Sequence, residues 1–186
     1  MFSKIEIRDL VISIVVLALI FSGFVLENFL EYLFIIIAVF ASHEIIGHKI
    51  VAQKYGCSAE YRMWPMGLLL GVITGFLGGI IFAAPGAVYI SPIVRKGFAF
   101  RVAHLTKKEY GIISLAGPAV NIAIGIILLI TNLFYPLGLL TITAKISFFL
   151  AFFNLIPILP LDGGKIFRWN KYIWFIAIVL AFIGFI

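Results

Sequence analysis

The sequence predicts an all-α polytopic membrane protein with about five transmembrane helices and one re-entrant or hairpin element. Of its 186 residues, 63% are hydrophobic and only 12% are charged, whereas a soluble domain has about 25% charged residues. Mean hydropathy is +1.20. The apolar residues form runs near bilayer-spanning length, with short basic segments between them. We therefore expect residues 1–186 to form a single membrane-embedded domain in contact with the lipid bilayer.

The net charge of +6 does not indicate a nucleic-acid partner, because the basic residues lie in short runs between the apolar segments. In such positions they orient membrane spans. We expect crossings at about 10–26, 29–54, 111–133 and 139–159, and a shorter apolar segment at 172–186. Basic residues before the first crossing and after the second place the N-terminus in the cytoplasm of a multi-pass cell-membrane protein: Lys4, Arg8, Lys49, Lys54 and Arg62.

Residues 66–84 are apolar and about long enough to span a bilayer, but they contain five glycines. A crossing here would place the basic segment 85–110 outside the cell, against its charge. We therefore predict that 66–84 is a re-entrant or hairpin element that enters and leaves on one side. Residues 87–91 are β-prone and bounded by Pro-Gly and Pro, which indicates a short strand near the membrane face.

The chemistry-bearing residues are His43, Glu44 and His48, in an apolar span, and Asp162, at the inner end of another. Ionisable side chains inside a membrane mark a functional site. The other six acidic residues are expected at span ends or in loops. Zinc in hydrolytic enzymes takes three imidazole or carboxylate ligands and keeps one position for water, and a free carboxylate beside it can act as the base. The four residues contain that complete set.

The spacing of the two histidines is one residue longer than in a His-Glu-x-x-His helix. On a regular α-helix an i,i+5 pair diverges by about 140°. Three arrangements are open. A π-bulge could absorb the extra residue, with Gly47 loosening the helix. Alternatively, Glu44 and His48 could be the ligands, with His43 beside the metal. In the third arrangement the site is degenerate and binds no metal.

Three segments carry a resemblance to a known family. They are Asn154-Leu155-Ile156-Pro157 with Pro160-Leu161-Asp162-Gly163-Gly164, then Gly117-Pro118-Ala119-Val120-Asn121, and His48 to Gly56. The chain resembles the site-2 protease family of intramembrane zinc metalloproteases over about 29–56 and 111–168, which would be its catalytic core. The resemblance implies a Zn²⁺ cofactor held by His43, His48 and Asp162, with Glu44 as the catalytic base. It also implies that Asn154 positions substrate or stabilises the developing oxyanion.

The leading hypothesis is an intramembrane zinc-dependent endopeptidase that cuts transmembrane or membrane-anchored proteins by metal-activated water. The alternative is a non-catalytic relative that binds or regulates transmembrane helices. A transporter using Glu44 and Asp162 has less support, because the sequence has no paired repeats. For Asn121 we expect a role in holding helices together. The sequence does not identify the substrate, the cleavage site or the oligomeric state.

Overall fold

The computed structural model describes residues 2–78, 81–96 and 99–186. Its helical segments are α1 Lys4–Phe21, α2 Leu26–Ile36, the π-helix η1 Ile37–Lys49, α3 Ile50–Lys54, α4 Pro65–Phe76, α5 Lys107–Phe134, α6 Gly138–Asn154, α7 Asp162–Trp169 and α8 Lys171–Phe185. The strands are β1 Ser58–Met63, β2 Gly86–Ser91, β3 Ile93–Lys96 and β4 Ala99–Val102. The prediction of a mostly helical protein is confirmed.

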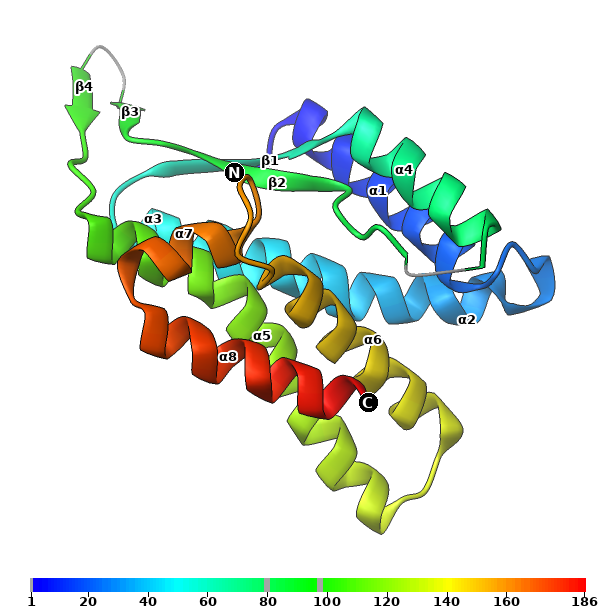
Figure 1. The fold of residues 1–186 in the computed structure, drawn as a ribbon. Helices are drawn as coiled ribbons and strands as arrows, with labels where there is room; N and C mark the ends of the chain where they lie inside the picture. Colours follow the sequence, from blue (N-terminus) through cyan, green and yellow to red (C-terminus); the bar gives the residue numbers. More distant parts are fainter. Residues whose placement is uncertain (1, 79–80, 97–98) are drawn as a thin grey trace.

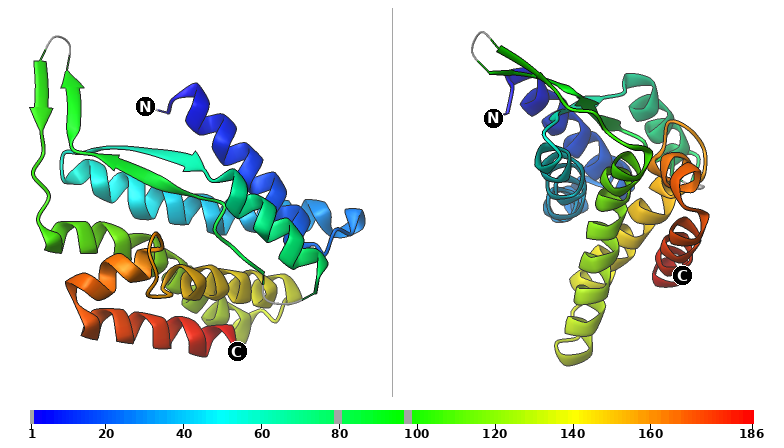
Figure 2. Two further views of the ribbon diagram at one scale, coloured as in Figure 1. Left: turned by 45° about the horizontal axis from the view of Figure 1, so that its top comes forward. Right: turned by 90° about the vertical axis from the view of Figure 1, so that its left-hand side faces the viewer.

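The centre of the fold is one continuous helical rod, formed by α2, η1 and α3. It crosses the middle of the molecule, with α1, α4 and the β1–β2 pair on one side and α5 to α8 on the other (Figures 1 and 2). This rod has 29 residues and α5 has 28, and both are apolar and long enough to cross a membrane. Three further apolar helices are shorter: α4, α6 and α8. The predicted count of about five crossings is therefore not confirmed.

Helix α1 differs from the predicted crossing at 10–26. It begins at Lys4, where the Ser3 side chain accepts the Glu6 N–H, and ends at Phe21. The backbone then turns through Gly23 and Phe24, which both have positive φ. Because an α-helix cannot continue through such residues, the chain reverses and α2 begins at Leu26. The sequence prediction ran the first helix through this turn.

Of the segment predicted to be a re-entrant or hairpin element, 66–84, the structure describes all but residues 79–80. Helix α4 leads away from β1, and the extended chain after it leads back into β2. The two ends meet, since the Trp64 N–H donates to the Pro85 carbonyl at 2.7 Å and Met63 pairs with Gly86 in the sheet. The segment therefore leaves and returns at one place. Twelve α4 residues extend about 18 Å, less than the roughly 30 Å of a bilayer core.

The strands correct the prediction of an all-α fold. Strand β2 confirms the β-prone stretch at 87–91, and its partner β1 was not predicted. The two run antiparallel, with Ser58 opposite Ser91 and Met63 opposite Gly86. Strands β3 and β4 form a second antiparallel pair, which projects from the body of the molecule (Figure 1). Apart from 87–91, the sequence suggested only a basic loop here, because short, polar strands lack a strong hydrophobic pattern.

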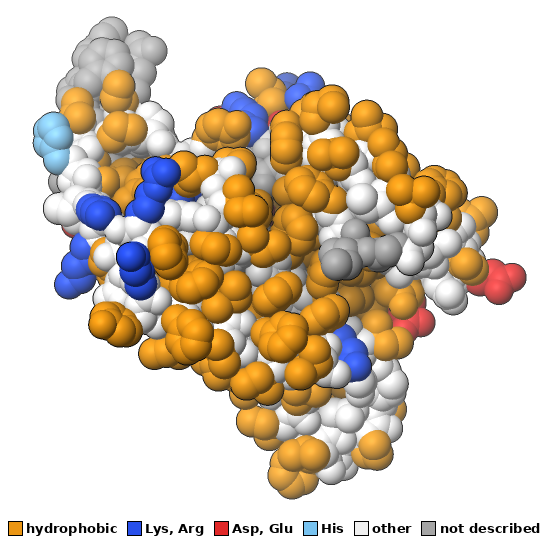
Figure 3. Space-filling view, in the orientation of Figure 1, with side chains coloured by type: hydrophobic (Ala, Val, Ile, Leu, Met, Phe, Trp, Pro, Cys, Tyr) orange, Lys and Arg blue, Asp and Glu red, His pale blue; other side chains and the backbone are white. Residues whose placement is uncertain are grey.

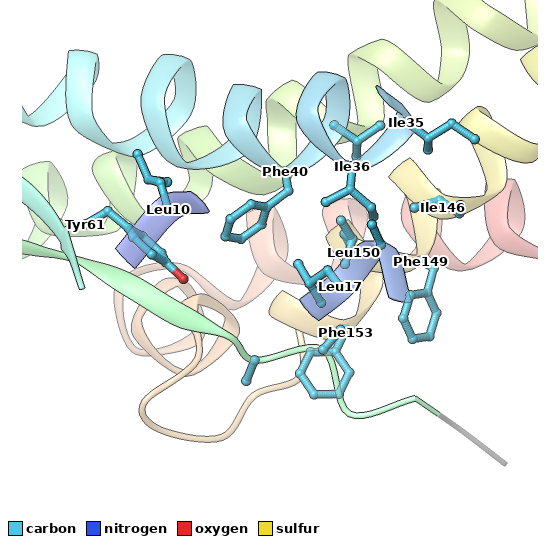
Figure 4. Close-up of a cluster of buried hydrophobic side chains, with 14 residues drawn as sticks. Leu10, Leu17, Ile35, Ile36, Phe40, Tyr61, Ile146, Phe149, Leu150 and Phe153 are labelled. Carbon is cyan, nitrogen blue, oxygen red and sulfur yellow. The ribbon is translucent and has the colours of Figure 1, made fainter. Parts of the chain in front are cut away.

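The main core joins helices from both sides of the rod. Figure 4 shows side chains of α1, α2, η1, β1 and α6 packed together, including Leu10, Leu17, Phe40, Tyr61 and Phe153. Outside this core, apolar side chains cover most of the visible face (Figure 3). An exterior of this kind suits a lipid surrounding, because water disfavours large apolar patches. The core ties the rod to α6, and the rod carries His43, Glu44 and His48 of the candidate site.

Candidate metal centre

The rod absorbs the extra residue between Glu44 and His48 by widening. The helix is π-type from Ile37 to Lys49, and the Ile50 N–H still donates to the Ile45 carbonyl, five residues back. In i→i+5 bonding the residue five positions on takes the place that i+4 has in an α-helix. His43 and His48 therefore lie on one face. The backbone is therefore the widened helix of the first arrangement open from the sequence.

The two imidazoles meet Asp162 in the interior of the protein. His48 Nε2 lies 3.1 Å from His43 Nε2 and 3.0 Å from Asp162 Oδ2, and His43 Nε2 is 3.9 Å from the same oxygen. Ligands bound about 2.0–2.1 Å from a tetrahedral zinc are separated by about 3.3 Å. The three donor atoms therefore have the chemistry and the spacing of a zinc ligand set, and all three residues are buried.

A hydrogen bond from the neighbouring helix sets the orientation of His48. Its Nδ1 lies 2.9 Å from the Ile113 carbonyl oxygen in α5. A carbonyl oxygen can only accept, so Nδ1 carries the proton and donates. In the neutral imidazole the lone pair is then on Nε2, the atom that faces His43 and Asp162. Such an outer hydrogen bond is a regular feature of metal-binding histidines.

Gly117 in α5 lets both imidazoles lie close to the helix backbone. A Cβ built on this glycine would lie 2.7 Å from His43 Nε2 and would overlap His48 Nε2. Gly47, in η1, packs against the Gly117 backbone, because a Cβ at Gly47 would lie 2.5 Å from the Gly117 Cα. The two glycines thus allow a close helix crossing, and Gly117 leaves room for the two histidine nitrogens beside it.

Asp162 reaches the site because the chain doubles back after α6. The backbone next to Asp162 packs tightly on the end of that helix, where a Cβ on Gly163 would overlap the Leu155 carbonyl. Asp162 is the first residue of α7. While its Oδ2 faces the histidines, its Oδ1 accepts from Lys165 Nζ at 3.0 Å. Sequence reasoning missed Lys165, although its i+3 spacing from Asp162 on a helix was a usable signal.

Glu44 and Asn154 lie at a pocket beside the three donors. The pocket holds about 180 Å³ and is lined by His48, Asp162 and Lys165 as well as by residues of strand β2. Glu44 Oε2 is buried and has no hydrogen-bond partner among the described residues, so it can accept a hydrogen bond from another group in the pocket. Asn154 lines the same pocket, with its Nδ2 donating to the Leu150 carbonyl.

Among the described residues, the side chain of Asn121 makes none of the helix-binding hydrogen bonds that we expected of it. We expected its side chain to bind helices together, but neither amide atom has a partner within the described part of the chain. The contact to α6 uses its backbone instead, because the Ser147 hydroxyl donates to the Asn121 carbonyl at 2.8 Å. The side chain therefore contributes no hydrogen bond to the helix pair.

Comparison with known proteins agrees with this geometry. The profile of peptidase family M50 matches residues 134–174, which include Asn154 and Asp162. A Methanocaldococcus jannaschii protein named provisionally as a zinc metalloprotease is 42% identical over 186 residues, covering 95% of this chain and 90% of that protein. A second protein of that organism, named zinc metalloprotease, is 30% identical over 75% of this chain and 34% of its own length. No solved structure matches.

Proposed function

Because the chain belongs to peptidase family M50, the site-2 protease family of zinc metalloproteases, we propose that it hydrolyses peptide bonds of membrane proteins within the bilayer. The observation that carries this proposal is the convergence of two imidazoles and a carboxylate at the side of a pocket with a free Glu44 carboxylate. His43, Glu44 and His48 lie on an apolar helical rod, so the water needed for hydrolysis must be held at the pocket.

His43, His48 and Asp162 would hold the zinc, and the donor set fits it. Bound zinc would lower the pKa of a water and polarise the scissile carbonyl. Glu44 would accept the proton from the attacking water and pass it to the leaving amine. Its unpartnered, buried Oε2 supports this role. Asn154, on the same pocket wall, would position the peptide or stabilise the developing oxyanion.

The pocket favours an extended substrate. Peptide groups in a transmembrane helix are bonded to each other, so the scissile bond must unwind before it can be attacked. Strand β2 lines the pocket from Gly86 to Ile90. Among the described strands it pairs only with β1, on one edge. An unwound peptide could add to the other edge by main-chain hydrogen bonds, which would also satisfy its freed backbone groups.

We further propose a multi-pass topology with a cytoplasmic N-terminus. Two helices are long enough to cross, and the shorter α6 and α8 would complete the bundle. Lys and Arg side chains gather at the end of the molecule that holds α3 and α7, while acidic side chains lie at the α2 end (Figure 3). The positive-inside rule assigns the α3 end to the cytoplasm. That end also holds the histidines and Asp162.

A reconstituted cleavage assay tests the function. The full chain in liposomes should cleave a co-reconstituted single-span substrate that contains a helix-destabilising Gly-Pro pair. Cleavage should fall to background when a zinc chelator is added, because the three buried side chains would lose the metal ion that they hold. Cleavage should return when zinc is restored. An intact, zinc-loaded chain that binds a range of such helices but cuts none of them would support the non-catalytic alternative instead.

A further inference from the structure

Helix α1 carries two buried carboxylates that sequence reasoning placed at a span end. Glu6 and Asp9 are only 1% and 3% exposed, and their i,i+3 spacing puts them on one helix face. Glu6 Oε1 accepts the Tyr61 N–H at 3.1 Å, and Asp9 Oδ2 accepts the Met63 N–H at 3.3 Å. Tyr61 and Met63 are two residues apart in β1, so their N–H groups point to the same edge of the strand. At that edge the two carboxylates accept the hydrogen bonds that a neighbouring strand would otherwise accept.

Glu6 also binds the metal-bearing helix. Both of its carboxylate oxygens accept from Lys49 Nζ, at 2.6 and 2.5 Å. Lys49 is 4% exposed, and its ammonium group lies 4.0 Å from the centre of the Phe2 ring. Lys49 directly follows His48 and is the last residue of the π-helix. A buried ion pair of this kind fixes both partners, because either charge alone would be buried without compensation.

The position of this pair matters because π-helices are rare and are usually limited to one turn. If η1 relaxed to α geometry, His43 and His48 would diverge to about 140°. The helix must therefore be held where it returns to α-helix, at Lys49 and Ile50. Just before this point, Gly47 and His48 contact α5. The anchor on Lys49 comes from α1, on the opposite side of the rod.

We propose that the buried Glu6–Lys49 ion pair holds the π-helical register of η1, so that His43 and His48 remain on one face. Glu6 and Lys49 are then positioning residues for the metal, although neither touches it. The inference rests on the proposed zinc site. Under this proposal α1 and β1 help to position the metal ligands, because Glu6 joins strand β1 to the end of η1 beside His48.

The experiment is a zinc-affinity measurement by chelator competition on the full chain in detergent, at a temperature well below unfolding. Glu6→Gln keeps an acceptor for the Tyr61 N–H and removes only the charge, and Lys49→Met removes the ammonium group at similar length. Each should weaken zinc binding by about tenfold or more, in the range found for outer-shell partners. Lys49→Arg keeps the positive charge and should retain near wild-type zinc affinity. Glu31→Gln removes an exposed acidic residue and serves as a control that should leave zinc affinity unchanged.

The double variant Glu6→Gln/Lys49→Met separates positioning from simple charge burial. It leaves no unpaired buried charge, so its folding stability should recover relative to the single variants, while zinc binding should stay weak. The absorption spectrum of bound Co²⁺ should also change from that of the wild type. If the double variant binds zinc with wild-type affinity, the positioning role of the ion pair is wrong but the proposed protease function still stands. If the wild-type chain takes up no zinc, both the positioning role and the proposed function are wrong.

Discussion

Glu44→Gln is expected to reduce cleavage of a membrane substrate by roughly 10²–10⁴-fold, the usual contribution of a general base, while leaving zinc content unchanged. The amide keeps the size of the side chain but cannot accept a proton from water. Glu44 is one residue from His43, yet it lies outside the group of three donor atoms. The assay combines the initial rate in liposomes with metal analysis of the same purified sample.

The zinc content of this variant distinguishes Glu44 as a catalytic base from Glu44 as a metal ligand. If Glu44 were itself a ligand, as in the second arrangement open from the sequence, Glu44→Gln would lose metal together with activity. The matched control is Glu31→Gln, because Glu31 is an exposed acidic residue at the other end of the rod. It should retain both zinc and activity. Cleavage that persists in Glu44→Gln would remove Glu44 from the role of base.

Gly117→Ala is expected to empty the metal site, from about one zinc per chain to near none, and to abolish cleavage. The added methyl group would stand 2.7 Å from His43 Nε2 and would overlap His48 Nε2. It would push both donor nitrogens away from their present positions, and a shift of either imidazole breaks the spacing of the three donors. Metal analysis and the liposome assay measure the two effects.

Gly125→Ala is the matched control for this substitution. It adds the same methyl group to the same helix, where it would meet the Phe148 ring at 2.5 Å. Overpacking of this kind costs about 1–3 kcal/mol, so Gly125→Ala should lower thermal stability without loss of zinc. Full zinc occupancy in a folded Gly117→Ala protein would show that the ion does not lie beside this glycine.

Local sequence patterns indicated the residues of the candidate site, because these residues are exceptional in their surroundings. His43, Glu44 and His48 stand in an apolar helix, and Asp162 comes shortly after the end of another. The sequence suggested similar depths in a bilayer for the two segments, and the structure brings His43, His48 and Asp162 together. The π-helix was only one of three options, since the backbone type depends on packing against α5 and α1. Lys165 and Gly117 acquire their places at the site only through tertiary structure.

The fold was predicted less completely than the site. Hydropathy located the long apolar helices and the hairpin at 66–84, but it extended the first helix through the turn at Gly23 and Phe24. The sequence also placed Glu6 and Asp9 at a span end and gave no sign that they are buried. Their burial depends on β1 and Lys49, which lie more than 40 residues away in sequence. Such partners cannot be identified from local composition.

The most direct test of the central claim is the zinc coordination of the purified protein, measured by X-ray absorption at the zinc edge. The account predicts two imidazole nitrogens and a carboxylate oxygen at about 2.0–2.2 Å in the wild type. It also predicts the loss of one imidazole in His43→Ala. A wild-type spectrum with a single imidazole, unchanged in His43→Ala, would show that the π-helix does not bring both histidines to one metal.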